Sequence, residues 1–176
     1  MTKVNANSDS RPKVGILMGS DSDLEVMREA EKRLDYFGIP HEIRVLSAHR
    51  SPKNTMDYAA SAESRGIEVI IVGAGAAAHL GGVVAAHTTL PVIGIPIDSS
   101  PLKGMDALLA TVQMPAGVPV ATMAIGKAGS ANAGILAAQI IGRKDPEVSA
   151  KLAKLKEEMA RGVEERDRNL NRQPQK

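Results

Sequence analysis

The sequence predicts one α/β domain of three layers, in which a doubly wound parallel sheet lies between two layers of helices. Short runs rich in β-branched residues alternate with stretches of helical periodicity, which is the pattern of consecutive βαβ units. The length of 176 residues suits a single domain with a substantial core. Aromatic residues make up only 2% of the chain, so this core must be built from Ala, Val, Ile, Leu and Met.

Five apolar runs are predicted to be strands, and they lie at Val14–Met18, Glu42–Leu46, Val69–Val72, Val92–Pro96 and Val118–Met123. Five such strands favour a flavodoxin-like arrangement. In a sheet of this kind, ligands bind just outside the carboxyl ends of the strands. The loops that follow the strands are therefore expected to carry the chemistry.

Helices are predicted between the strands, at Asp21–Phe37, Ser51–Gly66, His79–Thr88 and Gly104–Val112. The first has an apolar face and is followed by Gly38, a residue type that commonly ends helices. The second begins with Ser51 as its N-cap and Pro52 in its first turn.

Two further helices break the alternation. Residues 128–142 (AGSANAGILAAQIIG) are small or apolar nearly all round, and a helix with no polar face is buried on every side. A neighbouring subunit is the expected cover in so short a chain. The last helix begins at Asp145-Pro146, and its apolar stripe from Val148 to Met159 packs either on its own domain or on another subunit.

The folded part is predicted to be one domain over residues 13–168. Residues 1–12 are polar and are expected to be flexible. The chain is expected to fray beyond Arg166, with a flexible tail at residues 169–176.

Composition excludes several classes of protein. The net charge is only +2 and no basic stripe carries interleaved aromatics, which speaks against nucleic-acid binding. The absence of cysteine excludes disulfides, thiolate metal sites and cysteine nucleophiles. The N terminus lacks the apolar core of a signal peptide, and no apolar run free of glycine and proline is long enough to cross a membrane. A cytoplasmic protein is therefore expected.

The loop after the first strand reads Gly19-Ser20-Asp21-Ser22-Asp23 and runs into a helix. Hydroxyls and free amides at the N terminus of a helix form a site for an anion. An ordinary helix N-cap explains the same residues equally well. Asp23 does not favour an anion, but its carboxylate can accept hydrogen bonds from sugar hydroxyls.

The loop after the second strand reads Ser47-Ala48-His49-Arg50. An arginine offers a planar fork that matches phosphate, and imidazole can carry a proton in either direction near neutral pH. A single histidine in a loop is often structural, and that alternative stays open for His49.

The loop after the third strand, Gly73–Leu80, contains a G-x-G-x-x-A pattern. A dinucleotide site is not expected, because the pattern does not follow the first strand and no acidic residue lies about twenty positions further on. The small residues instead allow the backbone to approach a flat ligand. His79 has the same two interpretations as His49, whereas His41 and His87 are expected to be structural.

Two more loops complete the predicted edge. The fourth strand ends at Asp98-Ser99-Ser100, and residues 113–119 are expected to form a wall or a flap. No metal is expected, since His49 and His79 have no carboxylate at ligand spacing. The residues alone thus predict a small phosphate-bearing ligand and proton transfer by histidine, without defining a reaction.

Four stretches together resemble the PurE family of N5-carboxyaminoimidazole ribonucleotide mutases: Gly19–Asp23, Ser47–Arg50, Gly73–Leu80, and Gln113–Pro115 with Ala124–Gly126 after it. The resemblance covers Lys13 to Asp145 without a break. It implies a flavodoxin-like fold and movement of the carboxylate of N5-carboxyaminoimidazole ribonucleotide (N5-CAIR) from nitrogen to ring carbon C4, a step of purine biosynthesis. It also implies no cofactor, and a homo-octamer whose sites take residues from neighbouring subunits.

The resemblance assigns roles to individual residues. It implies that Ser20, Asp23 and Arg50 bind the substrate and that His49 is catalytic. The other residues expected to line the substrate site are Ser22, Ser47, Ala48, Gly75, Ala76, His79 and Leu80. Two departures from the family pattern are Gly81, where a proline is usual, and Ala76, where a glycine is usual.

Two alternatives remain open at this stage. The nearer one is an aminoimidazole ribonucleotide carboxylase, a lyase that takes free CO2 from solution. The more distant one is a non-catalytic nucleotide-binding module, in which His49 would be dispensable.

Overall fold

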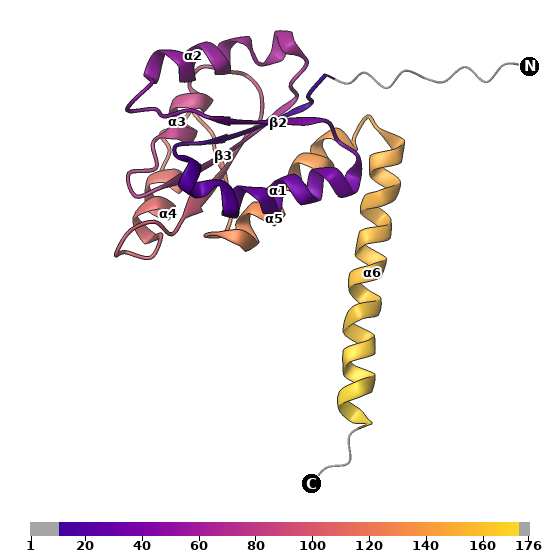
Figure 1. Ribbon diagram of the computed structural model, residues 1–176. Coiled ribbons are helices and arrows are strands. Elements are labelled where there is room, and N and C mark those ends of the chain that lie inside the picture. The colour runs from indigo at the N-terminus through magenta and orange to yellow at the C-terminus, as the bar shows by residue number, and fades with distance from the viewer. Residues whose placement is uncertain (1–10, 173–176) are drawn as a thin grey trace, which may run out of the picture.

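The computed structural model describes residues 11–172, and it has five parallel strands with helices on both faces of the sheet (Figure 1). The strands are β1 (Val14–Met18), β2 (His41–Val45), β3 (Val69–Gly75), β4 (Val92–Ile97) and β5 (Ala121–Thr122). Their order is β2-β1-β3-β4-β5, which confirms the predicted flavodoxin-like fold. The chain reverses its direction of winding between β1 and β3, and ligands bind at such a point in open α/β sheets.

The helices are α1 (Leu24–Phe37), α2 (Pro52–Ser61), α3 (Leu80–Ala85), α4 (Met105–Val112), α5 (Lys127–Ile141) and α6 (Pro146–Asn171), with 3-10 turns η1 (Asp21–Asp23) and η2 (Glu63–Arg65). The third helix is shorter than expected, since it ends at Ala85 and not at Thr88. β5 is also shorter than the predicted strand Val118–Met123. Pro119 lies within that predicted run, and a proline cannot donate a ladder hydrogen bond.

Alternating side chains of the strands build two cores. Val14, Ile16 and Met18 of β1 face the layer formed by α1 and α5, and Leu17 faces the opposite layer with α2 and α3. Strands buried on both faces explain the nearly continuous apolar runs in the sequence.

Helices α1 and α5 approach each other unusually closely. Ser130 Oγ of α5 accepts a hydrogen bond of 3.1 Å from the backbone N–H of Ala30, a residue 100 positions earlier in the chain. A Cβ atom on Gly134 would lie 2.7 Å from the carbonyl oxygen of Ala30. The small residues of α5 thus allow its backbone to reach that of α1.

A single chain buries only one side of α5. Ala133, Ala137 and Ala138 are fully buried, whereas Asn132 and Gln139 on the other side are exposed. The predicted burial on every side is therefore not achieved by a single chain.

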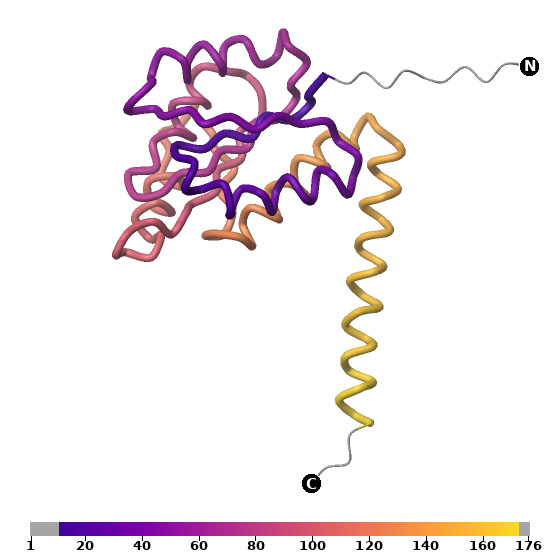
Figure 2. Tube along the Cα trace, viewed as in Figure 1, coloured from indigo at the N-terminus to yellow at the C-terminus, as the bar shows by residue number. Residues whose placement is uncertain are grey.

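The last helix, α6, leaves the domain after its first turns (Figures 1 and 2). Its N-cap Asp145 accepts hydrogen bonds from the N–H groups of Glu147 and Val148, and Val148 and Leu155 are buried against the domain. The second half projects outward with exposed apolar side chains. The first half of α6 thus packs on its own domain, which was one of the two predicted placements. Packing on another subunit, the other placement, stays a prediction for the second half.

The helix also continues further than predicted. It runs to Asn171, past Arg166, where fraying was expected, because neither glycine nor proline interrupts residues 163–171. The predicted flexible segments 1–12 and 169–176 otherwise lie mostly outside the described residues. Over residues 11–172, none of the helices combines the length and apolar character needed to span a membrane.

Candidate active site

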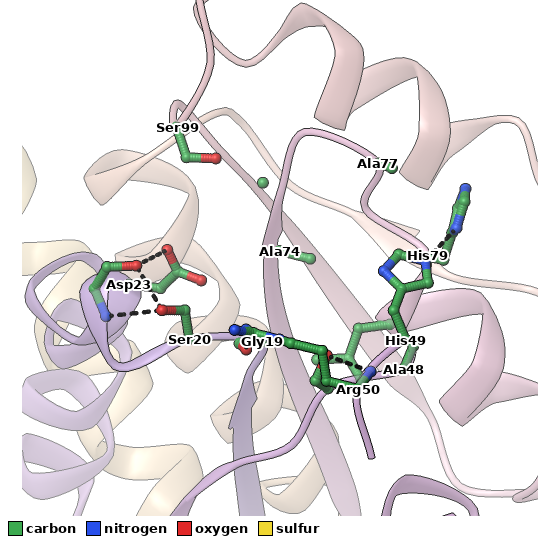
Figure 3. A pocket seen from close by; sticks show the side chains of 14 residues that line it. Gly19, Ser20, Asp23, Ala48, His49, Arg50, Ala74, Ala77, His79 and Ser99 are labelled. Atoms are coloured by element: carbon green, nitrogen blue, oxygen red, sulfur yellow. Dashed lines mark hydrogen bonds between the residues drawn. The ribbon is translucent and has the colours of Figure 1, made fainter. Parts of the chain in front are cut away.

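A pocket of about 210 Å³ opens at the carboxyl ends of the strands (Figure 3). It is lined by Gly19, Ser20, Ser22, Asp23, Ser47, Ala48, His49, Arg50, Ala74, Gly75, Ala77, His79, Leu80 and Ser99. Every site residue predicted from the sequence, except Ala76, lines this pocket. Three loops that are distant in sequence, those after β1, β2 and β3, thus meet where the fold predicts that they should.

Ala76 is the predicted residue that the structure does not place in the pocket wall. Its φ angle is 49°, in the left-handed region, where an L-residue other than glycine is disfavoured by roughly 1–2 kcal/mol. The extra methyl group is therefore accommodated by an exposed turn and does not narrow the pocket.

Arg50 is tied to the floor of the pocket. Its Nη2 donates to the carbonyl oxygen of Gly19 at 2.7 Å, and its Nε donates to Ser47 Oγ at 3.4 Å. The backbone N–H of Arg50 donates to the same Ser47 hydroxyl at 3.1 Å. These bonds hold a permanently charged group between the loops after β1 and β2, which suits it to bind phosphate.

Ser20 and Ser22 line the same pocket as Arg50, from the loop after β1. Ser20 caps the turn η1, where its Oγ accepts hydrogen bonds from the backbone N–H of Ser22 at 3.3 Å and from Ser22 Oγ at 2.8 Å. The N-cap interpretation of this loop is thus confirmed. The same hydroxyls also line the pocket, so the capping role and an anion-binding role are compatible.

Asp23 is a buried carboxyl group at the edge of the pocket. Burial raises its pKa above the ordinary value, and a hydrogen bond from the Ser22 hydroxyl partly offsets this effect. A carboxylate with so little solvation gains by accepting hydrogen bonds from a ligand. Hydroxyl groups of a sugar are donors of this kind.

His49 and His79 form a pair. Nε2 of His49 lies 2.8 Å from Nδ1 of His79, across 30 positions of sequence, so one of these two nitrogens donates to the other. The rings are nearly perpendicular, with an interplanar angle of 81°. In Figure 3 the His49 ring lies between His79 and Ala74, so its second nitrogen, Nδ1, faces the pocket. The arrangement can deliver a proton to a ligand and take one back.

The other two histidines lie elsewhere, in agreement with their predicted structural role. Nδ1 of His41 is 3.0 Å from the carbonyl oxygen of Ile39, and Nδ1 of His87 is 2.8 Å from that of Val83. Neither lines the pocket.

Two other expectations concerned the surroundings of the pocket. Residues 113–119, expected to form a wall or flap, do not line it in this chain. Gly81 lies in the first turn of α3 and does not line the pocket; a Cβ there would make ordinary contact, 3.6 Å from Val120 Cγ1. Within residues 11–172 no group of three or more His, Cys, Asp or Glu is arranged to hold a metal ion.

Sequence reasoning placed Ser99 at the predicted edge of the sheet but did not count it among the residues of the substrate site. It is the second residue after β4, whose carboxyl end reaches the same edge as those of β1 and β3. That position was the available signal, since each loop at this edge can contribute a side chain.

Known proteins resemble this chain over most of its length. Residues 13–162 match the family model described as AIR carboxylase. The chain is 56% identical over 160 residues to an N5-carboxyaminoimidazole ribonucleotide mutase of Pyrococcus horikoshii, covering 91% of this chain and 89% of that protein. It is 57% identical to the mutase of Thermotoga maritima, covering 90% and 92%. The crystal structure of Treponema denticola PurE superposes with a TM-score of 0.83 at 30% identity, covering 92% of this chain and 100% of that one.

Proposed function

The chain belongs to the AIR carboxylase family, and we propose that it is the isomerase that converts N5-CAIR into carboxyaminoimidazole ribonucleotide (CAIR) in purine biosynthesis. The observation that carries the proposal is the His49–His79 pair, which faces the same pocket as the fixed guanidinium of Arg50. Mutases with more than half of their residues identical over about nine-tenths of the chain support the same reaction.

The nucleotide is held at three places in this proposal. Arg50, Ser20 and Ser47 bind the 5′-phosphate, where hydrogen bonds to a charged group are strongest. Asp23 accepts from the ribose hydroxyls. The imidazole ring then lies over Ala74 and Gly75, where small side chains leave room for a flat group beside His49.

The pair defines which nitrogen of His49 acts. If Nδ1–H of His79 donates to Nε2 of His49, the proton of neutral His49 is on Nδ1, which faces the ligand. His49 gives this proton to the carbamate nitrogen as the N–C bond breaks and CO2 leaves. Carbon C4 then attacks CO2, and His49 removes the proton from C4. The proton returns to its donor, so the reaction balances without a co-reactant.

The small pocket has a second role. CO2 that stays beside the ring recombines in an effectively intramolecular step, which avoids much of the entropic cost of capture from solution. Leakage of CO2 would instead make the enzyme depend on dissolved CO2.

Labelled bicarbonate distinguishes the mutase from the carboxylase. With N5-CAIR as substrate, we expect little label from the medium in CAIR formed during the first turnovers. Product that carries the label of the medium from the start would contradict the mutase reaction and establish the lyase in its place. A control with aminoimidazole ribonucleotide and labelled bicarbonate measures the rate at which free CO2 is captured.

Arg50→Lys is expected to weaken nucleotide binding by about tenfold or more, although the charge is kept. A lysine is a point charge and cannot span Gly19, Ser47 and a phosphate at once. Calorimetric titration with aminoimidazole ribonucleotide measures the effect. Lys53→Gln, at an exposed cation on α2 paired with Asp57, is the matched control and should leave affinity unchanged. An unchanged dissociation constant for Arg50→Lys would show that Arg50 does not bind the phosphate.

The proposal includes a homo-octamer. Two helices expose apolar stripes that one chain leaves uncovered: Met105, Leu109 and Val112 on α4, with Leu102 in the turn before it, and Met159, Val163 and Leu170 on α6. Exposed apolar patches of this kind are typical of subunit interfaces. The proposal also includes the cytoplasmic location predicted from the sequence, since a phosphorylated substrate does not cross membranes unaided.

Light scattering tests the assembly. We expect a mass of about eight times the 18.5 kDa of one chain, and a lower mass when Met159 and Val163 are both replaced by glutamate. A stable monomer at micromolar concentration would contradict the octamer.

A further inference from the structure

Ser99 brings an unused hydroxyl group to the pocket. It lies on the loop after β4, outside the four stretches that carry the family resemblance. Figure 3 shows it on the opposite side of the pocket from His49 and His79, with Ala74 between them. A Cβ atom on Gly75 would lie 2.8 Å from Ser99 Cβ and would overlap its hydroxyl oxygen. Glycine at position 75 is thus what allows Ser99 to approach this wall.

The loop that carries Ser99 is anchored on its far side. Ser100 Oγ donates to Asp106 Oδ2 at 2.7 Å and accepts from the N–H of Leu102 at 3.1 Å. The hydrogen bond from Ser100 lowers the pKa of Asp106, so this carboxylate stays ionised at neutral pH. The turn closes through Lys103 and Gly104, both at positive φ. Ser99 therefore sits on a defined turn next to the pocket.

The hydroxyl of Ser99 has no protein partner among residues 11–172. The other polar side chains of the wall are engaged with one another or with the backbone. A hydroxyl group offers one donor and two acceptor sites, and all of them are available to a ligand here.

We propose that the Ser99 hydroxyl donates a hydrogen bond to N3 of the substrate imidazole, which makes it a specificity-determining residue. This inference rests on the proposed function. With His49 at the edge that carries C4 and the amino group, the opposite wall faces the edge that carries C2 and N3. N3 is the ring nitrogen with a free lone pair, so it is the acceptor that a hydroxyl on that wall can reach. The bond fixes the rotation of the ring and keeps C4 near His49.

Binding of two ligands distinguishes a hydrogen bond to the imidazole ring from a contact with the sugar phosphate. Aminoimidazole ribonucleotide carries the ring, and ribose 5-phosphate lacks it. In Ser99→Ala, calorimetric affinity for the ribonucleotide is expected to fall about tenfold, the effect of one lost hydrogen bond, while affinity for ribose 5-phosphate stays within about twofold. Ser99 is exposed, so the variant is expected to fold with an unchanged melting temperature.

The other outcomes overturn the proposal in distinguishable ways. Unchanged affinity for the ribonucleotide means that Ser99 does not touch the ring. An equal loss for both ligands means that it contacts the sugar phosphate or that the loop has shifted. If the unsubstituted protein fails to bind the ribonucleotide, the proposed function itself is wrong. Ser99→Cys keeps the shape of the side chain but donates only weakly. Its affinity for the ribonucleotide should therefore lie between those of the unsubstituted protein and Ser99→Ala.

Discussion

His49→Asn is expected to lower kcat by about 100-fold or more, with nucleotide affinity and folding little changed. An amide approximates the shape of an imidazole but cannot exchange a proton near neutral pH, and general acid–base catalysis commonly contributes this much. In the proposed reaction His49 acts twice, once to protonate the carbamate nitrogen and once to deprotonate C4. Steady-state rates with N5-CAIR, together with calorimetric titration of the nucleotide, measure both parts.

His87→Asn is the control for this variant. His87 is exposed, lies in the turn after α3, contacts the backbone of that helix at Val83 and lies outside the pocket, so its replacement should leave kcat unchanged. If His49→Asn retained more than about a tenth of the original rate, His49 could not be the proton carrier. Full retention of nucleotide binding without any turnover in the unsubstituted protein would instead favour the non-catalytic module.

Gly134→Ala is expected to lower the free energy of unfolding by about 2 kcal/mol. The new Cβ would lie 2.7 Å from the carbonyl oxygen of Ala30 and 2.8 Å from Cβ of Arg33, so α1 and α5 must move apart. Overpacking of this kind costs on the order of 3 kcal/mol, and the higher helix propensity of alanine offsets about 1 kcal/mol of it. Chemical denaturation followed by far-ultraviolet circular dichroism measures the change.

The same substitution at Gly162 separates the effect of helix packing from that of the helix propensity of alanine. Gly162 lies in the projecting part of α6, and a Cβ there would meet nothing within 4 Å. Gly162→Ala should therefore be neutral or stabilise the protein by up to about 1 kcal/mol. Equal effects at the two positions would show that the close approach of α1 and α5 does not constrain the fold.

The alternation of strands and helices predicted the topology because it depends on local pattern alone. Residues such as Ile16 and Ile71 are β-branched and lie in short apolar runs, so their strands were visible without knowledge of the fold. Strands that alternate with helices run parallel, and this brings the loops after β1, β2 and β3 to one edge of the sheet. His49 and Arg50 were found because they occupy that edge.

Features that depend on contacts between distant segments were not predictable. The bond between His49 and His79 requires the relative position of two loops to within an ångström, which no spacing in the sequence specifies. Ser99 was placed at the predicted edge but not in the substrate site, because its approach to Gly75 on another strand is not visible in the sequence. The length of β5 was overestimated because the apolar run around Val118 and Val120 resembles a strand despite Pro119.

The packing of α1 on α5 also has a consequence for how the chain reaches its native state. Ala30 and Ser130 are joined across 100 residues, so this contact cannot form until α5 has been synthesised. At a synthesis rate of roughly 5–20 residues per second, α1 leaves the ribosome about 5–20 s before its partner helix exists. During that interval the side of α1 that packs on α5, at Ala30 and Arg33, is uncovered. We therefore expect nascent chains that end before α5 to be captured by chaperones, and the domain to become protease-resistant only after residue 141 has emerged.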